Sequence, residues 1–275
     1  MGTYLSKALI KKDIQDIFRS KTLLVTMIII PILFSVIFPS VVLVGALIFD
    51  AEKIAGDDGQ KLIDAFLSSA MGDEISSYTL EQQIVYMFIN FMLPTLFLLV
   101  PIITALTVAA NSFVGEKENR TLESLLFSPI SIKTLFLSKI VASFIPPLFV
   151  SVISFVVCGV IINSLGYPLF GELIFPSSNW LALITCLSPM VILLTVLLNI
   201  FISARVKTYQ EAQNLGGVIV LPVIAMMIGQ VSGLFLLGVQ LIILISVGIL
   251  IVNLLLWSRI SKSNDRYVLF EKQIH

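Results

Sequence analysis

Residues 115–130, GEKENRTLESLLFSPI, form a block of charge between two long apolar runs. A charged side chain near the centre of a membrane-spanning helix costs about 2.5–3.5 kcal/mol, so this block is expected outside the hydrocarbon of a bilayer. Within it, leucines recur at the i, i+3, i+4 spacing of one helix face, and Pro129 ends the pattern. The block predicts a short amphipathic helix that docks on a partner. Its candidate contact residues are Glu116, Lys117, Glu118, Arg120, Leu122, Glu123, Leu125 and Leu126.

The composition around this block is that of an integral membrane protein. Hydrophobic residues make up 57% of the 275 residues, charged residues make up 12%, and the mean hydropathy is +1.04. These values lie outside the range of soluble domains. Cys158 and Cys186 lie in apolar runs, where thiols are expected to be inert small side chains rather than a disulfide. The formal net charge of zero gives no indication of a nucleic-acid partner, and we expect none.

Five charge-free stretches exceed the roughly 20 residues that a helix needs to cross a bilayer. The last of them, residues 212–258, is too long for one crossing and is expected to fold back at residues 229–233, where two glycines stand. The fold class is therefore all-α, a single transmembrane domain over residues 1–275 with six membrane-spanning helices. We place the spans at about 22–49, 87–110, 136–162, 180–204, 212–229 and 234–257.

The distribution of basic residues predicts the orientation in the membrane. Of the 17 lysines and arginines, all but Lys53 and Lys61 fall on the side of the two termini. By the positive-inside rule, both termini of this multi-pass protein of the cell membrane lie in the cytoplasm. Residues 50–86 then form an external loop and residues 111–135 a cytoplasmic loop. Residues 3–20 are predicted to be an interfacial amphipathic helix. Its apolar face is expected to contain Tyr4, Ile10, Ile14, Ile17 and Phe18.

The sequence lacks the side chains that an enzyme or a self-powered pump needs. Its one histidine is His275, and it contains neither a P-loop nor a cluster of metal ligands, so we expect no catalytic residue, no bound metal and no directly bound cofactor. Lys139 stands only at the edge of a predicted span, and no ionisable residue lies in a span interior. Neutral polar residues in the spans are expected mostly to bond between helices. They are Asn90, Thr104, Thr107, Asn199, Gln230, Gln240 and Asn253.

Prolines recur along the predicted spans. Inside lipid, each proline frees a carbonyl that a neighbouring helix has to satisfy, so we expect bent helices in a tightly associated bundle. Any single one of these kinks is more simply interpreted as static packing than as a moving part. The prolines are Pro31, Pro39, Pro94, Pro101, Pro146, Pro147, Pro189 and Pro222.

Two cytoplasmic segments resemble loops of the ABC-2 type permeases. Residues 115–130 resemble the G-E-K-E-x-x-T-L-E-x-L-L-x-x-P-[IV] loop that joins the second and third spans of that family. Residues 204–213, ARVKTYQEAQ, look like the A-x-[ST]-[FY]-x-E-A-Q loop of the sodium-extrusion branch. The candidate residues of this second cytoplasmic loop are Arg205, Lys207, Tyr209, Glu211 and Gln213.

The resemblance implies a fold like that of the type V ABC exporters and a role as the membrane subunit of such an exporter. The working unit would be a homodimer or heterodimer of permeases in the lipid bilayer. Two ATPase subunits beneath it would bind ATP and Mg, and the 111–135 loop would form a coupling helix in a groove of the ATPase. No enzymatic activity is expected in this chain, and an intramembrane protease or lipid transferase is the weakest alternative.

The substrate stays open at this point. Sodium-extrusion relatives commonly have a much larger external domain than the 50–86 loop of this chain, so export of an ion and efflux of a peptide or antibiotic, including an immunity function, are both kept. The alternative from another class is a membrane scaffold or sensor that works with an ATPase but does not transport.

Overall fold

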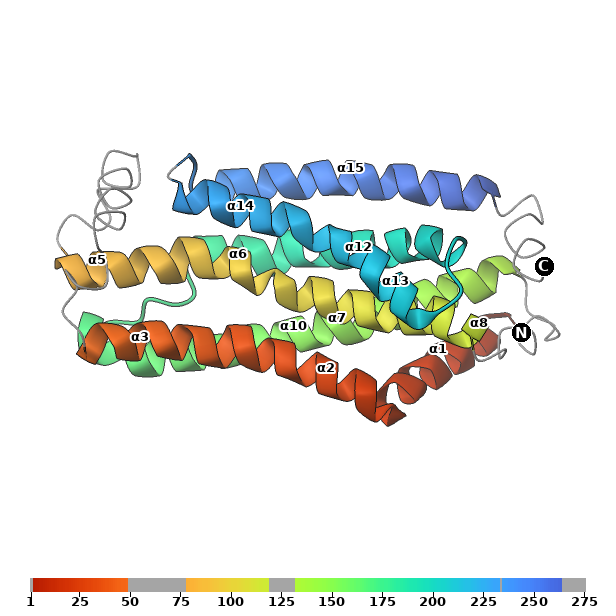
Figure 1. Cartoon of the computed structure of the whole chain (residues 1–275), viewed down its shortest axis with the longest axis horizontal. Coiled ribbons are helices and arrows are strands. Elements are labelled where there is room, and N and C mark those ends of the chain that lie inside the picture. Colours follow the sequence, from red (N-terminus) through yellow and green to blue (C-terminus); the bar gives the residue numbers. More distant parts are fainter. Residues whose placement is uncertain (1, 49–77, 119–131, 233, 264–275) are drawn as a thin grey trace.

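The computed structural model describes residues 2–48, 78–118, 132–232 and 234–263, and all regular elements within them are helices (Figure 1). Six helical stretches are long and apolar enough to cross a membrane, which makes the chain an all-helical multi-pass membrane protein. We call them spans 1 to 6. They cover Lys21–Ile48, Leu80–Glu118, Thr134–Phe170, Ser178–Ser203, Tyr209–Val231 and Val239–Ile260.

Several spans are built from consecutive helical pieces. α1 (Gly2–Arg19) precedes span 1, which consists of α2 (Lys21–Ile32), the π-helical segment η1 (Leu33–Ile37) and α3 (Phe38–Ile48). Span 2 contains α5 (Leu80–Met87), η3 (Phe88–Met92), α6 (Leu93–Phe97), α7 (Leu99–Ala110), η4 (Asn111–Gly115) and α8 (Glu116–Glu118). Span 3 lies in the single helix α10 (Ile132–Phe170). Span 4 contains α11 (Ser178–Ala182), η5 (Leu183–Leu187) and α12 (Ser188–Ser203). Span 5 contains α13 (Tyr209–Gly216), the 3-10 segment η6 (Gly217–Val220) and α14 (Leu221–Val231), and span 6 lies in α15 (Val239–Ser263).

The helices lie side by side along the long axis of the bundle, which gives it two ends (Figure 1). We call the end at which α1, α8 and the start of α13 lie the near end, and the end at which α3 finishes and α5 begins the far end. The long apolar run after residue 212 folds back between the end of α14 at Val231 and the start of α15 at Val239. Residues 49–77, which include most of the predicted external loop, lie outside the described residues.

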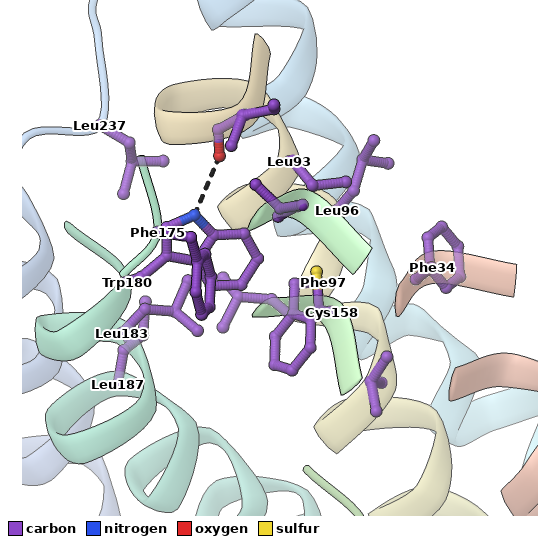
Figure 2. Close-up of a cluster of buried hydrophobic side chains, with 14 of the residues drawn as sticks. Phe34, Leu93, Leu96, Phe97, Cys158, Phe175, Trp180, Leu183, Leu187 and Leu237 are labelled. Carbon is purple, nitrogen blue, oxygen red and sulfur yellow. Dashed lines mark hydrogen bonds between the residues drawn. The ribbon is translucent and has the colours of Figure 1, made fainter. Parts of the chain in front are cut away.

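Span 2 is the central helix of the bundle. In its most apolar window 83% of residues are buried, whereas the corresponding values for spans 5 and 6 are 22% and 17%. Around its far half lies a cluster of fully buried side chains, including Phe97, Trp180 and Leu183 (Figure 2). Because lipid tails are as apolar as these side chains, close packing and polar contacts hold such helices together. Span 2 is thus positioned to pass a displacement to several neighbours.

The helix α1 presents an unexpected face to the bundle. Its most buried residues, spaced four apart, are Leu9, Asp13 and Ile17, whereas Phe18 is 48% exposed. Of the side chains predicted to form the apolar face, Ile17 is buried and Phe18 is not, because the helix packs on α10 through the side that carries Asp13. The buried Asp13 carboxylate lies beside the ammonium group of Lys139 in α10.

Candidate functional site: a charged junction at the near end

The charged block begins as the last turn of span 2. Glu116, Lys117 and Glu118 form α8, which follows directly on the π segment η4. Successive residues of a helix project about 100° apart, so three neighbouring side chains reach in three directions. We use the name charged junction for these three residues together with the groups that they contact.

Glu116 reaches a lysine buried in the bundle. Lys139 of α10 is 2% exposed, and its ammonium pairs with the Glu116 carboxylate. The same ammonium donates to the Ser112 carbonyl at 2.8 Å and lies 5.9 Å from the centre of the Phe113 ring. Removing a charge from water is costly unless it is paired and hydrogen-bonded, and this lysine has both kinds of partner. The contact fixes the end of span 2 against span 3.

Asp13 connects Lys139 to the N-terminal helix α1. Its carboxylate is buried, and one oxygen lies 3.9 Å from the Lys139 ammonium. Among the described residues, neither carboxylate oxygen of Asp13 has a hydrogen-bond partner. Burial raises the pKa of Asp13, and the positive charge of Lys139 opposes that rise. Lys139 is therefore the one cation that holds carboxylates from both α1 and α8.

Lys117 and Glu118 reach in another direction, to the connection between spans 4 and 5. The Lys117 ammonium donates to the Val206 carbonyl at 3.0 Å and to that of Ser203, the last residue of α12, at 3.4 Å. The Glu118 carboxylate accepts from the backbone N–H of Tyr209, the first residue of α13, at 2.8 Å. Each charge thus meets the helix end that attracts it, a cation at a C-terminus and an anion at an N-terminus.

The second predicted loop, residues 204–213, is ordered by its own polar residues. Thr208 caps α13 by accepting from the Glu211 backbone N–H at 3.3 Å, and the Glu211 carboxylate accepts from the Lys207 N–H at 3.0 Å. Further along α13, the Gln213 amide donates to the hydroxyls of Tyr209 at 2.6 Å and of Thr107 in span 2 at 3.2 Å. The two loops that the sequence singled out separately therefore meet at one place in the fold.

A comparison with known protein families identifies the family of this chain. The family description "ABC-2 family transporter protein" matches residues 7–255, which is most of the chain. The chain belongs to the ABC-2 transporter family. It is thus the membrane permease component of an ABC transporter, and its family implies a partner ATPase subunit. No curated protein and no solved structure gave a significant match.

The structure places some of the predicted junction residues and not others. The permease brings Glu116, Lys117 and Glu118 together with the second loop, in which Arg205 and Lys207 have exposed side chains. Their predicted contact with an ATPase stays a prediction. The remaining coupling residues lie outside the described residues; they are Arg120, Leu122, Glu123, Leu125 and Leu126.

Sequence reasoning missed two residues of the charged junction, Asp13 and Lys139. A usable signal was present in each case. Lys139 is a lone cation that begins an otherwise apolar run, and Asp13 interrupts the i, i+4, i+8 series between Leu9 and Ile17. A carboxylate on a buried helix face requires a cation opposite it, and Lys139 is such a cation.

Of the polar residues predicted to bond between helices, Thr107, Gln230 and Asn253 do so. Gln230 of span 5 accepts from the Thr95 hydroxyl at 2.7 Å and donates to the Phe91 carbonyl at 2.9 Å in span 2, and Asn253 of span 6 donates to the Met190 carbonyl of span 4 at 2.9 Å. Three others form local contacts. Asn90 donates to the Tyr86 carbonyl at 3.2 Å, Thr104 to the Val100 carbonyl at 2.6 Å and Asn199 to the Thr195 carbonyl at 2.9 Å, all within their own helices. Thr107 differs, because its hydroxyl accepts from Gln213 of span 5. Among these four side chains, the contact at Thr107 is the one that adds to the charged junction.

A first prediction tests the Glu118 contact. Replacing Glu118 by alanine removes the acceptor of the Tyr209 N–H and should speed hydrogen exchange of residues 207–213 by roughly 5- to 10-fold, as expected for losing about 1–1.5 kcal/mol of local stability. Exchange mass spectrometry of the full-length permease in nanodiscs measures this. Glu172→Ala is the matched control, because Glu172 accepts its hydrogen bond from Tyr78 at the far end. Equal exchange rates at residues 207–213 in the parent protein, Glu118→Ala and Glu172→Ala would show that Glu118 does not hold the second loop.

Proposed function

We propose that this permease is the membrane subunit of an ABC exporter, with its near end in the cytoplasm. It acts as a dimer of permeases with two ATPase subunits, which hydrolyse ATP with Mg while this chain forms the path across the bilayer. The observation that carries the proposal is the charged junction. At the point where the family's motif begins, three consecutive charges tie span 2 to α1, α10, α12 and α13.

The orientation is supported by the basic residues of the near end. Lys117 and Lys139 lie in the charged junction, and further lysines lie on α1, where Lys7, Lys11 and Lys12 are exposed. An excess of lysine and arginine is the mark of the cytoplasmic side. The near end is then the side at which a cytoplasmic ATPase can reach the chain.

The charged junction suggests how hydrolysis is linked to the spans. The segment 119–131, with its predicted leucine stripe, enters a groove of the ATPase, and its displacement acts directly on α8. Glu116 passes the displacement through Lys139 to α10 and to Asp13 of α1. Lys117 and Glu118 pass it to the facing ends of α12 and α13. No chemical step is needed in this chain, because its residues bind, orient and transmit.

Substitutions in the leucine stripe test the proposal. Replacing Leu125 by aspartate places an unpaired charge in the docking contact and should weaken ATPase association by at least about 2 kcal/mol, or roughly 30-fold in Kd. Reversing Arg120 to glutamate changes a rim charge, so the complex should form while its ATP hydrolysis becomes poorly linked to transport. The two variants separate docking from transmission.

The measurement is co-purification of the ATPase with the tagged full-length permease, followed by ATP hydrolysis in reconstituted vesicles with sodium and with cationic peptides as trial substrates. Gln15→Asp is the matched control for an added charge, because Gln15 is exposed on α1, outside the six spans. If Leu125→Asp binds the ATPase and supports hydrolysis like the parent protein, residues 119–131 are not the coupling element and the exporter assignment loses its main support.

A further inference from the structure

Three spans contain the same irregularity next to a proline. The π segments η1, η3 and η5 end two residues before Pro39, Pro94 and Pro189, respectively. The sequences are LFSVIFP at 33–39, FINFMLP at 88–94 and LITCLSP at 183–189. Each has a polar residue four positions before the proline: Ser35, Asn90 and Thr185. We call these three elements the π–proline joints.

The backbone bonds show what each joint does to its helix. The residue before the proline donates its N–H five residues back, from Phe38 to Leu33, from Leu93 to Phe88 and from Ser188 to Leu183. The shift to a bond five residues back leaves one carbonyl without its donor, and the proline that follows has no N–H for the next, so two carbonyls lose their donors in the helical ladder. In span 2 these are the carbonyls of Ile89 and Asn90. A helix with a gap in its ladder bends there more easily than elsewhere.

In span 2, side chains of another helix fill the gap. The Trp180 indole N–H donates to the Ile89 carbonyl at 2.9 Å, drawn as the dashed line in Figure 2, and the Asn179 amide donates to the Asn90 carbonyl at 3.1 Å. Both donors belong to α11, on the far side of the joint in span 4. The freed carbonyls therefore tie the far portions of spans 2 and 4 to each other.

Further bonds make this region one unit, which we call the far-end cap: α5, η3, the 171–177 connection, α11 and the end of α10. The Gln82 amide donates to the Leu169 carbonyl at 2.8 Å, and Asn163 exchanges two hydrogen bonds with the backbone of Phe175. The Phe175 and Trp180 rings meet edge to face with centres 5.1 Å apart. The cap is thus held together across helices by bonds that do not run along the spans.

Span 3 provides the contrast. α10 runs from Ile132 to Phe170 as one α-helix although Pro146, Pro147 and Pro168 lie in it. Ser143 stands four residues before Pro147, so neither a proline nor a polar residue at that position is sufficient for a joint. A helix without a π segment therefore carries the far-end cap, and three helices with π segments run beside it.

We propose that the π–proline joints are flexing points that let the near portions of spans 1, 2 and 4 move relative to the far-end cap. Flexing at the joints can be measured in the permease without the ATPase. A negative result for the joints is therefore distinguishable from a negative result for the exporter assignment, which is tested by ATPase binding and transport.

Distances between spin labels test the proposal in the full-length permease in nanodiscs, with Cys158 and Cys186 first replaced by alanine. One pair, Leu181→Cys with Phe201→Cys, spans the joint of span 4, and the other, Gln240→Cys with Arg259→Cys, lies along α15, which contains neither a proline nor a π segment. All four positions are exposed and the separations in sequence are nearly equal. We expect the span 4 pair to have the broader distance distribution.

The proline itself is tested by Pro189→Ala, which restores an N–H that can donate to the carbonyl of Ile184 or Thr185. This change should narrow the span 4 distribution to the width of the α15 pair and leave the α15 pair itself unchanged. Equal widths for the two pairs in the parent protein would overturn the proposal even if Pro189→Ala did not fold. An unaltered span 4 width in a folded Pro189→Ala protein would overturn it as well.

Discussion

Replacing Lys139 by methionine is expected to lower the free energy of unfolding of the permease by about 3–5 kcal/mol. The ammonium group is the shared partner of Glu116 and Asp13, and its loss removes the cation that lies beside the buried Asp13 carboxylate and pairs with the partly buried Glu116 carboxylate. Methionine retains the length of the aliphatic stem, so the loss reports the charge rather than a cavity. Unfolding of the purified protein in mixed micelles with increasing denaturant measures the change.

The pH dependence of the same variant gives a second observable. Burial already raises the pKa of Asp13 above 3.8, and Lys139 opposes the rise, so removing Lys139 raises the folded-state pKa further. A carboxyl with a raised pKa binds its proton more tightly in the folded state. The resulting stabilisation is complete below the ordinary pKa of 3.8 and is lost as the pH rises through the raised value. The deficit of Lys139→Met should therefore shrink on acidification.

The matched control removes all three charges together. The triple variant Asp13→Asn, Glu116→Gln, Lys139→Met keeps the shapes of the side chains and should recover most of the stability lost in the single variant, because buried ion pairs can be replaced by neutral groups at little cost. Lys11→Met changes an exposed lysine of α1 and should unfold like the parent protein. If Lys139→Met alone is as stable as Lys11→Met, the buried pairing of Asp13 with Lys139 does not hold α1 to the bundle.

The spans could be predicted from sequence because hydrocarbon imposes one strong requirement, a run of about 20 apolar residues per crossing. The charged block at residues 115–130 could be predicted for the same reason, because hydrocarbon excludes charged side chains. Span 2 was predicted to end at about residue 110, and the helix itself continues to Glu118 and includes the first three charges of the block. Charges can extend a helix beyond its apolar run when each finds a partner at once, and Lys139, Val206 and Tyr209 provide those partners.

The buried pair of Asp13 and Lys139 could not be predicted from separate helices, because the two residues lie far apart in sequence and each looks like part of a solvated edge. A span-by-span interpretation assigns Lys139 to the start of a helix and Asp13 to a polar face. Their pairing follows from the way α1 packs on α10, which depends on the whole near end. Pairing of this kind depends on tertiary packing, whereas hydropathy is a local property.

The prolines illustrate the same limit. Sequence predicted that they free carbonyls and that neighbouring helices satisfy them, and the bonds from Asn179 and Trp180 to span 2 confirm this at Pro94. It did not predict which prolines carry a π segment. Pro147 and Pro189 both follow a polar residue at the same spacing, yet only the second lies next to such a segment. A proline with a polar residue four positions before it is therefore not enough to predict a π segment.

The second large effect is expected at the far-end cap. Replacing Trp180 by alanine should lower the free energy of unfolding by about 3–5 kcal/mol, because the side chain is fully buried and its removal leaves a cavity. The lost ring packs against Phe97 at 5.2 Å and Phe175 at 5.1 Å between centres. The Ile89 carbonyl also loses its donor, at a position where the proline of the joint already removed the backbone N–H.

Two substitutions separate these contributions. Trp180→Phe keeps most of the ring contact and removes the N–H, so it should cost about 1–3 kcal/mol, the usual penalty of an unsatisfied buried acceptor. Trp257→Ala removes the other tryptophan, which is 40% exposed on α15, and should cost less than Trp180→Phe. Unfolding in mixed micelles compares all three. If Trp180→Phe is as stable as the parent protein, the hydrogen bond from the Trp180 indole to the Ile89 carbonyl, which joins the far portions of spans 2 and 4, does not contribute to the free energy of unfolding. In that case ring packing and the remaining hydrogen bonds of Gln82, Asn163 and Asn179 would hold the far-end cap, because the carbonyl freed by the joint in span 2 would be satisfied in some other way.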